Sequence, residues 1–420
     1  MKIKNVFARE ILDSRGNPTV EANVVLENGN EAKAAVPSGA STGKYEALEL
    51  RDNDFKNYAG KGVLRAIENI KKIIAPAIIG QEADPKQIDQ TIIDLDGTKN
   101  KSRLGANAAL AVSLAVARVT AKTEALPLYR YIANIYQFRN DYKLPTPLFN
   151  SVNGGKHSDS GLDIQEFMVI PMKQGDFKEK VKTGTEVFWA LRDVLKKRGQ
   201  TFAVGDEGGF APKLKNTEKV FELLVSISEF TRHSLGDEVC FGLDVAASSF
   251  YNEEKGKYFF ERKKRSNKEM MDIYLRWFKK YPLCLIEDPF SEDDWGLWPE
   301  LTKKIVSLNN NFLVVGDDLF TTNVSRLKMG IENRAANAVL IKLNQIGTLT
   351  ETIDCINLAQ NNKYRIVISH RSGETNDDFI ADLAVAVGAD FIKAGAPNRG
   401  ERVAKYNRLM EIEEELKSKK

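Results

Sequence analysis

The stretch RIVISHRSGET, residues 365–375, shows the pattern that decides the fold. Its apolar, β-branched run IVI at 366–368 is typical of a strand that is buried on both faces. The strand then changes, without a polar turn, into the hydroxyls, imidazole and guanidinium of SHRS at 369–372. A core strand that ends directly in such groups indicates that it delivers them to a shared polar centre.

The same change from apolar strand to polar group recurs from about Pro145 onward. The eight strand candidates are TPLFNSV (146–152), QEFMVI (165–170), CFGLDV (240–245), LCLIED (283–288), LVVGDD (313–318), AVLIKL (338–343), IVISH (366–370) and DFIKAG (390–395). From the third candidate onward, a helical pattern follows each strand. Near-continuous apolar strands that alternate with helices predict a parallel sheet covered on both faces, and eight units predict a closed β/α barrel of the TIM type.

The beginning of this barrel is predicted to be irregular. Only a loop separates the first two strand candidates, and it is too short for a crossover helix. Two helix patterns, 175–199 and 217–235, lie between the second and third candidates. We therefore expect a β-hairpin followed by a helix pair in place of the first two regular units.

The N-terminal third has a different organisation. The segment 18–37 holds two strand patterns joined at Asn28-Gly29-Asn30, and helical patterns follow at 63–78 and 104–125. Strands followed by helices predict an α+β cap domain. We expect this cap, with a lid loop, over residues 1–135 and the barrel over residues 136–420.

Composition limits the function classes. The chain has 420 residues, 42% hydrophobic residues and a formal net charge of +3, which favours neither a nucleic-acid nor a membrane-surface partner. Its three cysteines lie far apart, as expected for reduced, buried thiols. We find no signal-peptide core and no apolar run long enough to span a bilayer, so we expect a cytoplasmic protein.

Polar groups collect at the ends of the candidate strands. They are Asn150, Asn153, Gln165, Glu166, Asp244, Glu287, Asp288, Asp317, Asp318, Lys342, His370, Arg371 and Lys393. One such group is usually only the first solvated position of a loop. Repeated around one rim of a barrel, where catalytic groups gather, they predict a site.

Charge suggests how this rim works. Asp244, Glu287 and Asp317 come from successive strands, and converging carboxylates need a cation, for which hard oxygen ligands favour Mg²⁺. The alternative is an acidic rim without an ion. Lys342 and Lys393 each follow a buried strand, so either could be a base of lowered pKa or simply a counter-charge for the acids.

Further candidates follow from donor chemistry and glycine-rich loops. His370, Arg371 and Ser372 offer a fork of donors for phosphate or carboxylate. The loops FNSVNGGKHSD (149–159) and VGDEGGFAP (204–212) present His157 and Glu207, although the second could be an ordinary acidic turn. The segment VPSGASTG (36–43) fails the P-loop pattern, and we interpret it as a mobile lid that carries Ser41, or else as a linker.

Ten stretches together resemble the enolase family. They are DSRGNPTVE, VPSGASTG, NGGKHSDSGLDIQEFM, VGDEGGFAP, LDVAAS, IEDPF, GDDLF, IKLNQIGTLTET, SHRSGET and IKAGAP, spanning residues 13–397. The resemblance implies a glycolytic hydro-lyase that converts 2-phospho-D-glycerate reversibly to phosphoenolpyruvate with two Mg²⁺ ions per active site. It also implies a homodimer or an octamer.

The resemblance also implies a role for each candidate residue. Lys342 matches the base that removes the C2 proton, and Glu207 matches the acid that protonates the departing C3 hydroxyl, with Glu166 and Gln165 beside it and His157 near the leaving group. Arg371 and Ser372 match the phosphate ligands, Lys393 a contact to the substrate carboxylate, and His370 lines the site. Asp244, Glu287 and Asp317 match the ligands of the first Mg²⁺, and Ser41 helps to hold the second.

Two other functions stay open at this stage. Another member of the superfamily could act on a different acid, but Ser41, Arg371 and Ser372 would then lack a purpose. A binding role at the cell surface, after export without a signal peptide, could add to catalysis, because the terminal Lys419 and Lys420 are of the kind that captures plasminogen in some enolases. The alternative for these two lysines is a frayed, solvated terminus. Strict strand alternation would also place Gln165 and Glu166 on opposite faces.

Overall fold

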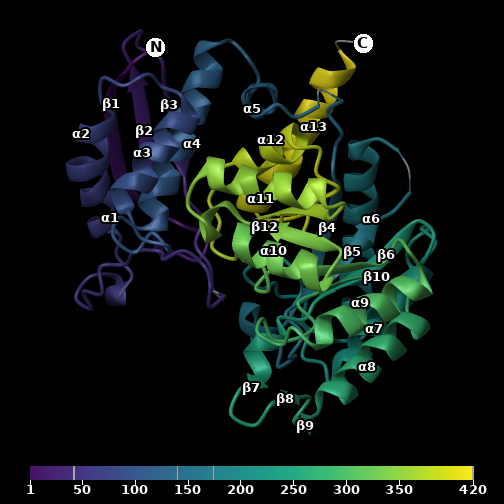
Figure 1. The fold of residues 1–420 in the computed structure, drawn as a ribbon. Coiled ribbons are helices and arrows are strands. Elements are labelled where there is room, and N and C mark those ends of the chain that lie inside the picture. Colours follow the sequence, from purple (N-terminus) through teal and green to yellow (C-terminus); the bar gives the residue numbers. More distant parts are fainter. Residues whose placement is uncertain (41–42, 140, 174, 419–420) are drawn as a thin grey trace.

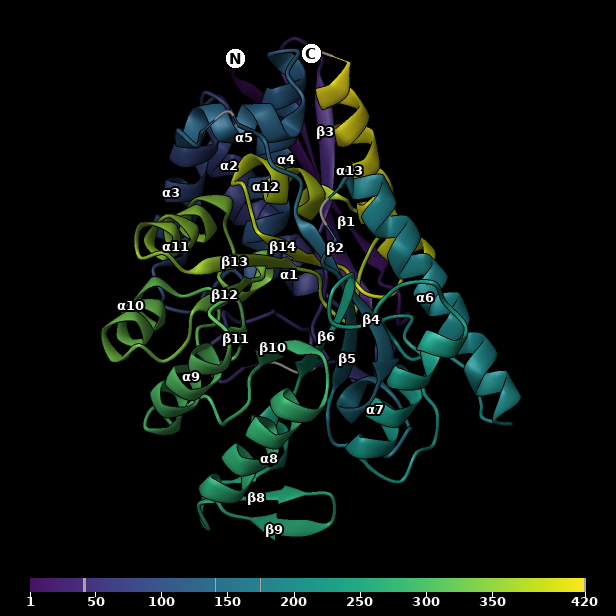
Figure 2. The same cartoon turned by 90° about the vertical axis from the view of Figure 1, so that its right-hand side faces the viewer.

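The computed structural model describes residues 1–40, 43–139, 141–173 and 175–418. Ser41, Lys419 and Lys420, named above, lie outside these residues. A three-stranded sheet with its helices forms the N-terminal part, and a β/α barrel forms the rest, as Figures 1 and 2 show. The predicted architecture of an α+β cap before a modified barrel is confirmed.

The N-terminal sheet is an antiparallel meander. Its strands β1 (Ile3–Leu12), β2 (Pro18–Leu26) and β3 (Glu31–Ala35) pair in sequence order. Gly29 adopts a left-handed φ of 83° in the turn between β2 and β3, at the predicted hairpin. Strand β1 was not predicted, although its alternation of charged and apolar residues is itself the pattern of a half-buried strand.

Helices follow this sheet in the chain. They are α1 (Leu64–Asn69), a π-helical turn (Ile70–Ile74), α2 (Ala75–Ile78), α3 (Pro85–Asp96), α4 (Ala106–Thr123) and α5 (Leu128–Tyr136). The segment from α1 to α2 contacts β1, whereas α3 and α5 pack against α4. The alanine-rich α4 packs against β2 and β3 and is buried over most of its length. Helix α5 crosses the division that we place between residues 135 and 136, and this division stays a proposal.

The barrel is closed by eight strands. They are β4 (Thr146–Asn153), β5 (Glu166–Pro171), β6 (Val239–Asp244), β10 (Leu283–Glu287), β11 (Leu313–Gly316), β12 (Ala338–Ile341), β13 (Arg365–Ser369) and β14 (Phe391–Lys393). β5 pairs antiparallel with both β4 and β6, and the other strand pairs are parallel. The hairpin start is therefore confirmed.

Helices surround the barrel strands. The helix pair after the hairpin is α6 (Phe177–Lys197) and α7 (Thr217–Ser226), and the later helices are α8 (Asn267–Lys280), α9 (Leu297–Leu308), α10 (Val324–Asn333), α11 (Leu349–Asn361), α12 (Phe379–Ala386) and α13 (Gly400–Lys417). A small sheet that was not predicted, β7 (Tyr251–Asn252), β8 (Lys257–Phe260) and β9 (Lys263–Arg265), precedes α8 at the lower end of Figure 1.

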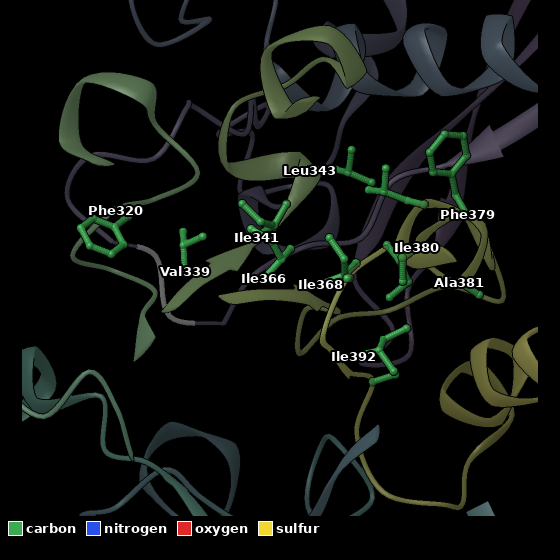
Figure 3. Close-up of a cluster of buried hydrophobic side chains, with 14 of the residues drawn as sticks. Phe320, Val339, Ile341, Leu343, Ile366, Ile368, Phe379, Ile380, Ala381 and Ile392 are labelled. Carbon is green, nitrogen blue, oxygen red and sulfur yellow. The ribbon is translucent and has the colours of Figure 1, made fainter. Parts of the chain in front are cut away.

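Alternation along the strands divides the core into two layers. Inside the barrel lies one apolar cluster, which includes Met168, Leu285, Leu340 and Val367. The outward residues of the same strands, such as Ile341 and Ile368 in Figure 3, pack against the surrounding helices. Because both faces are apolar, the polar groups of the barrel strands are confined to their ends.

Two further expectations concern thiols and membranes. Cys240, Cys284 and Cys355 are buried and are not in disulfides, as predicted. Within the described ranges, we find no helix whose length and apolarity would let it cross a bilayer.

Candidate active site

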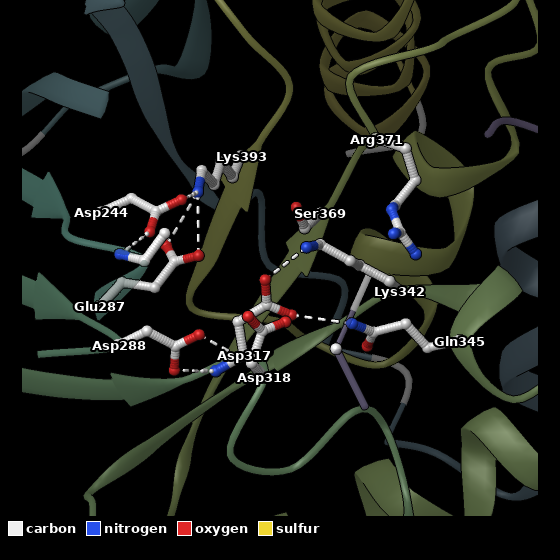
Figure 4. Close-up of polar contacts among 12 residues, drawn as sticks. Asp244, Glu287, Asp288, Asp317, Asp318, Lys342, Gln345, Ser369, Arg371 and Lys393 are labelled. Atoms are coloured by element: carbon white, nitrogen blue, oxygen red, sulfur yellow. Dashed lines mark hydrogen bonds and ion pairs between the residues drawn. The ribbon is translucent and has the colours of Figure 1, made fainter. Parts of the chain in front are cut away.

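Lys393, the last residue of β14, lies at the centre of three carboxylates. Its Nζ is 2.9 Å from Asp244 Oδ2 and 2.9 Å from each carboxylate oxygen of Glu287 (Figure 4). Glu166 Oε1 lies 3.2 Å from the same nitrogen. The lysine side chain is only 3% exposed. One buried ammonium thus faces three carboxylates, so this part of the rim can attract additional positive charge.

A second cation lies two strands away along the rim, at the end of β12. Lys342, directly after β12, forms an ion pair with Asp317 Oδ2, and Gln345 Nε2 donates to Asp317 Oδ1 over 2.9 Å (Figure 4). Thr322 donates its hydroxyl to Gln345 Oε1 over 2.8 Å, which fixes the amide so that its NH₂ faces Asp317. Both oxygens of Asp317 are therefore held in place by neighbours.

Asp288 holds the backbone from which Asp317 projects. It lies directly after β10 in a left-handed conformation with φ of 43°, and its two oxygens accept the backbone N–H groups of Asp317 (2.9 Å) and Asp318 (2.8 Å). One carboxylate oxygen from each of these three residues lies within 4.8 Å of the others. Strain of this kind at a strand end is typical of positions that a site requires.

The pKa values of these groups follow from burial and neighbours. Burial, and then the charge of Asp244, raise the pKa of Glu287 well above its usual range, while burial and Asp318 do the same for Asp288. Burial opposes ionisation of Asp317, but Lys342 outweighs it and lowers the pKa of that carboxyl. A set of buried oxygen donors with too little positive charge fits a hard divalent cation.

The structure differs from our expectation for the pKa of Lys342. Burial lowers it and Arg371 and Lys393 lower it further, yet the ion pair with Asp317 has the larger effect and the net pKa is raised. Proximity of other cations was the argument from sequence, and the contact with Asp317 could not be foreseen there. Lys342 therefore needs to part from Asp317 before it can act as a base.

Glu207 and Glu166 form the acidic side of the pocket. Asn150 Nδ2 donates to Glu207 Oε2 over 2.7 Å, and His157 Nδ1 lies 3.4 Å from the same oxygen and 3.7 Å from Glu166 Oε1. Burial and the charge of Glu207 raise the pKa of Glu166 well above its usual range. Burial also disfavours ionised Glu207, but its neighbours, His157 first among them, lower the pKa of this carboxyl on balance, in the opposite direction from that of Glu166.

The direction of β5 resolves how Gln165 and Glu166 both reach the site. We described them at the end of a strand, but they lie at its beginning, and the antiparallel course of β5 brings that beginning to the rim where the parallel strands end. Gln165 precedes the strand, so alternation does not apply to it. Its Nε2 donates to Asp244 Oδ2 over 3.1 Å, while Glu166 contacts Lys393.

The predicted anion-binding residues lie on the side of the N-terminal part. Arg371 Nη1 donates to Glu46 Oε2 over 2.8 Å and to Asn344 Oδ1 over 2.9 Å. Ser372 Oγ accepts the backbone N–H of Ala40 over 2.7 Å, directly before the predicted lid residue Ser41. The cap thus contacts the site through the segment in which sequence analysis placed a lid.

One pocket brings most of the predicted residues together. It is lined by His157, Gln165, Glu166, Glu207, Asp244, Lys342, Ser369, His370, Arg371, Ser372 and Lys393. Its volume is about 20 Å³, enough for about one water molecule. A substrate would therefore have to displace ion pairs of the pocket as it binds. Glu287 and Asp317 reach this pocket through Lys393 and Lys342.

Sequence analysis missed three residues that organise the site. Glu46 pairs with Arg371, Gln345 orients Asp317, and the fully buried Arg402 of α13 contacts the segment 370–372. Gln345 lies within the stretch IKLNQIGTLTET and could have been found there. Glu46 and Arg402 carry no local signal, because only the fold brings them to the rim.

Comparison with known proteins places the whole chain. Residues 3–132 match the family model "Enolase, N-terminal domain", and residues 141–420 match "Enolase, C-terminal TIM barrel domain". The curated enolase of Elusimicrobium minutum (strain Pei191) is 54% identical over 420 residues, which cover 100% of this chain and 97% of the relative.

Proposed function

The chain belongs to the enolase family of hydro-lyases, and from this premise we propose that it interconverts 2-phospho-D-glycerate and phosphoenolpyruvate with Mg²⁺. The observation that carries the proposal is the single pocket that contains Lys342, Glu207, Arg371 and Lys393. A base, an acid and two anion-binding cations in one buried space are the groups that this dehydration needs.

Lys342 is the base in this proposal. The hydrogen on C2 is a very weak acid, because its removal adds charge next to a carboxylate, so the base must be neutral and placed close to it. The side chain of Lys342 is only 13% exposed, and its Nζ pairs with Asp317. Once Asp317 is occupied otherwise, burial and the charges of Arg371 and Lys393 favour the neutral amine.

Glu207 is the acid that protonates the C3 hydroxyl as it leaves. Glu166, whose pKa is raised by burial and by the charge of Glu207, lies beside Glu207 and can supply it with the proton. Oxygens of the two carboxylates lie within 4.8 Å of each other together with a nitrogen of His157. His157 lies between both acids and faces the leaving group in this assignment.

The remaining residues bind the two anionic ends of the substrate. Arg371 and Ser372 bind the phosphate, and a guanidinium suits it because its N–H groups can engage two oxygens at once. Lys393, with Gln165 and His370 near it, binds the substrate carboxylate. This separation holds C2 near Lys342 and the C3 hydroxyl near Glu207.

Asp244, Glu287 and Asp317 would hold the first of two Mg²⁺ ions, and Ser41 would help to hold the second. These ions, when bound, supply positive charge that stabilises the dianion formed after proton removal. The excess of buried carboxylates over lysines supports this assignment for the first ion. Ser41 lies outside the described residues, so its role rests on the family alone.

The test is the ultraviolet absorbance of phosphoenolpyruvate as the purified protein meets 2-phospho-D-glycerate. We expect an Mg²⁺-dependent rise that EDTA removes, and a loss of about 10²–10⁴-fold in kcat for Lys342→Ala. Lys363→Ala, at an exposed position before β13, is the control and should retain full activity. Well-folded protein that gives no rise with Mg²⁺ would refute the proposal.

The quaternary structure and a second role stay predictions. A homodimer or an octamer follows from the family and can be distinguished by light scattering. Plasminogen binding through Lys419 and Lys420 concerns residues outside the description, and it can be checked by surface binding of the chain with and without its last two residues.

A further inference from the structure

Arg402 is a buried cation whose shortest contacts are with neutral groups. It lies in the first turn of α13 with no exposed surface, and among the described residues its ion pair is with Glu401, 3.4 Å from Nε. Its Nη1 instead lies 2.6 Å from His370 Nδ1 and 2.6 Å from the carbonyl oxygen of Arg371. Its Nη2 lies 2.6 Å from the Ser372 carbonyl oxygen and 3.1 Å from that of Asp206.

These contacts determine the state of the His370 ring. A guanidinium stays protonated in proteins and has no acceptor, so Arg402 must be the donor in the contact with Nδ1. His370 Nδ1 therefore carries no hydrogen, and the neutral ring has its hydrogen on Nε2. An imidazolium would place a second N–H against that of Arg402, which is unfavourable.

His370 Nε2 is directed at the pocket. Among the described residues it has no hydrogen-bond partner, and its nearest acid oxygen is Glu207 Oε1 at 3.7 Å, beyond hydrogen-bond distance. His370 is one of the residues that line the pocket. An unpaired, buried N–H that faces a binding pocket is ready to donate to an oxygen of a bound molecule.

The charges around the ring agree with this state. Burial is the main reason why the pKa of His370 is well below its usual value, and Arg402, Lys393 and Lys342 lower it further while Glu207 alone raises it. The ring is accordingly neutral at physiological pH, and it cannot serve as a proton source there.

We propose that Arg402 is a positioning residue that holds His370 as the neutral Nε2–H tautomer, so that His370 donates a hydrogen bond to an oxygen of the bound substrate. The same guanidinium joins the acid loop, through Asp206, to the anion-binding segment, through Arg371 and Ser372. Arg402 thereby sets the distance between the two ends of the pocket. The role in turnover rests on the proposed function, whereas the tautomer does not.

The test uses ¹⁵N-histidine-labelled full-length protein without substrate. Only His157, His233 and His370 give signals, and His370→Asn and His233→Gln assign them. Long-range ¹H–¹⁵N spectra distinguish the two neutral tautomers and the imidazolium. We expect the Nε2–H form of His370 from pH 6 to 8. The Nδ1–H tautomer or an imidazolium in the wild-type protein at pH 7 would overturn the proposal without any variant.

Variants separate positioning from simple structural support. Arg402→Met should populate the other tautomer or the imidazolium and lower kcat about 10²-fold. Arg402→Lys keeps a charged donor, so it should restore part of the Nε2–H population and part of kcat. Arg408→Met, which removes an arginine of the same helix bound to Asp382, should change neither the spectrum of His370 nor kcat. An unchanged His370 spectrum in folded Arg402→Met, together with lower kcat, would leave Arg402 a structural role only.

The two proposals fail in different ways. If the wild-type protein shows no phosphoenolpyruvate formation while His370 has the Nε2–H form, the proposed function is wrong and the tautomer stands. If turnover is normal and the tautomer is absent, only the role of Arg402 is wrong.

Discussion

Lys393 at the barrel rim and Lys405 in α13 are equally deep but differently surrounded. Lys405 Nζ has one carboxylate, Glu374, and two carbonyl oxygens, those of Thr375 and Glu401, all at 2.7 Å. Its three donors thus meet three acceptors and its charge meets one opposite charge. Lys393 meets three carboxylates.

The difference teaches that burial of charge does not by itself mark a functional site. The pair of Lys405 and Glu374 is balanced, and we expect it to serve stability. The group around Lys393 holds three carboxyl groups against one lysine next to a pocket, so their full ionisation is costly without a further cation, and the group is therefore informative about function. Four experiments test whether buried charges of these two kinds differ in their effects on stability and catalysis.

The largest effect is expected at the balanced pair. Lys405→Met leaves Glu374 buried without its cation, and we expect the free energy of unfolding to fall by about 3–5 kcal/mol. Urea unfolding followed by circular dichroism measures it. At urea concentrations below the unfolding transition, kcat of Lys405→Met should stay within a few-fold of wild type. A loss of kcat as large as that of Lys393→Met would show that the two lysines do not differ in role.

The matched substitution at the rim should act on catalysis. Lys393→Met removes a positive charge from the site where charge develops, and we expect kcat to fall by about 10²–10³-fold, which equals about 2.7–4 kcal/mol. The absorbance assay at saturating Mg²⁺ measures this loss. Normal turnover in a folded Lys393→Met protein would show that the rim does not need this lysine.

Mg²⁺ should stabilise the folded protein through the unbalanced group. At a concentration 100 times its dissociation constant, one bound ion adds about 2.7 kcal/mol, visible as a rise in Tm by calorimetry. Asp244→Asn should reduce this rise, while Asp390→Asn, at the opposite end of β14, should keep it. An equal rise in both variants would place the ion elsewhere.

The smallest expected change in stability concerns a buried carboxyl group that forms no ion pair within the described ranges. Asp89 of α3 accepts the N–H and hydroxyl of Thr350 in α11, and burial raises its pKa from 3.8 to about 6. The folded state therefore binds this proton more tightly, so its contribution to stability is complete below pH 3.8 and is lost as the pH rises through 6.

Asp89→Asn removes this pH dependence. The full linkage is worth about 3 kcal/mol, and we expect a gain of about 1–2 kcal/mol at pH 8, because the new amide must bury its NH₂ group. At pH 4 the gain should disappear. Thermal unfolding at the two pH values measures it, and a variant that is less stable at pH 8 would contradict the assigned pKa.

The barrel could be predicted because its strands carry a strong local signal. Runs such as AVLI at 338–341 are apolar on both faces, and each ends in a polar group. Strand β1 was missed although its alternation of charged and apolar residues is a strand signal, whereas β7 to β9 are only two to four residues long and carry little signal. The hairpin of β4 and β5 was predicted, but the end of β5 that reaches the rim was misjudged, because the antiparallel course brings the beginning of this strand there.

The site residues could be predicted as a set, and their mutual contacts could not. Strand ends placed Asp244, Lys342 and Lys393 on one rim. Arg402 was missed because its partners lie about 30 and 196 positions earlier in the chain. The raised pKa of Lys342 was missed for the same reason, since Asp317 precedes it by 25 residues.

The closure of the barrel by β14 against β4 sets an order of events during synthesis. Phe391 pairs with Thr146, so the chain must leave the ribosome through Phe391 before the last seam can form. Until then Asp244 and Glu287 are present without Lys393, and the segment 370–372 is present without Arg402. For the 106 residues between Glu287 and Lys393, the nascent chain therefore carries these acids without their lysine, and the segment that closes the barrel also supplies it.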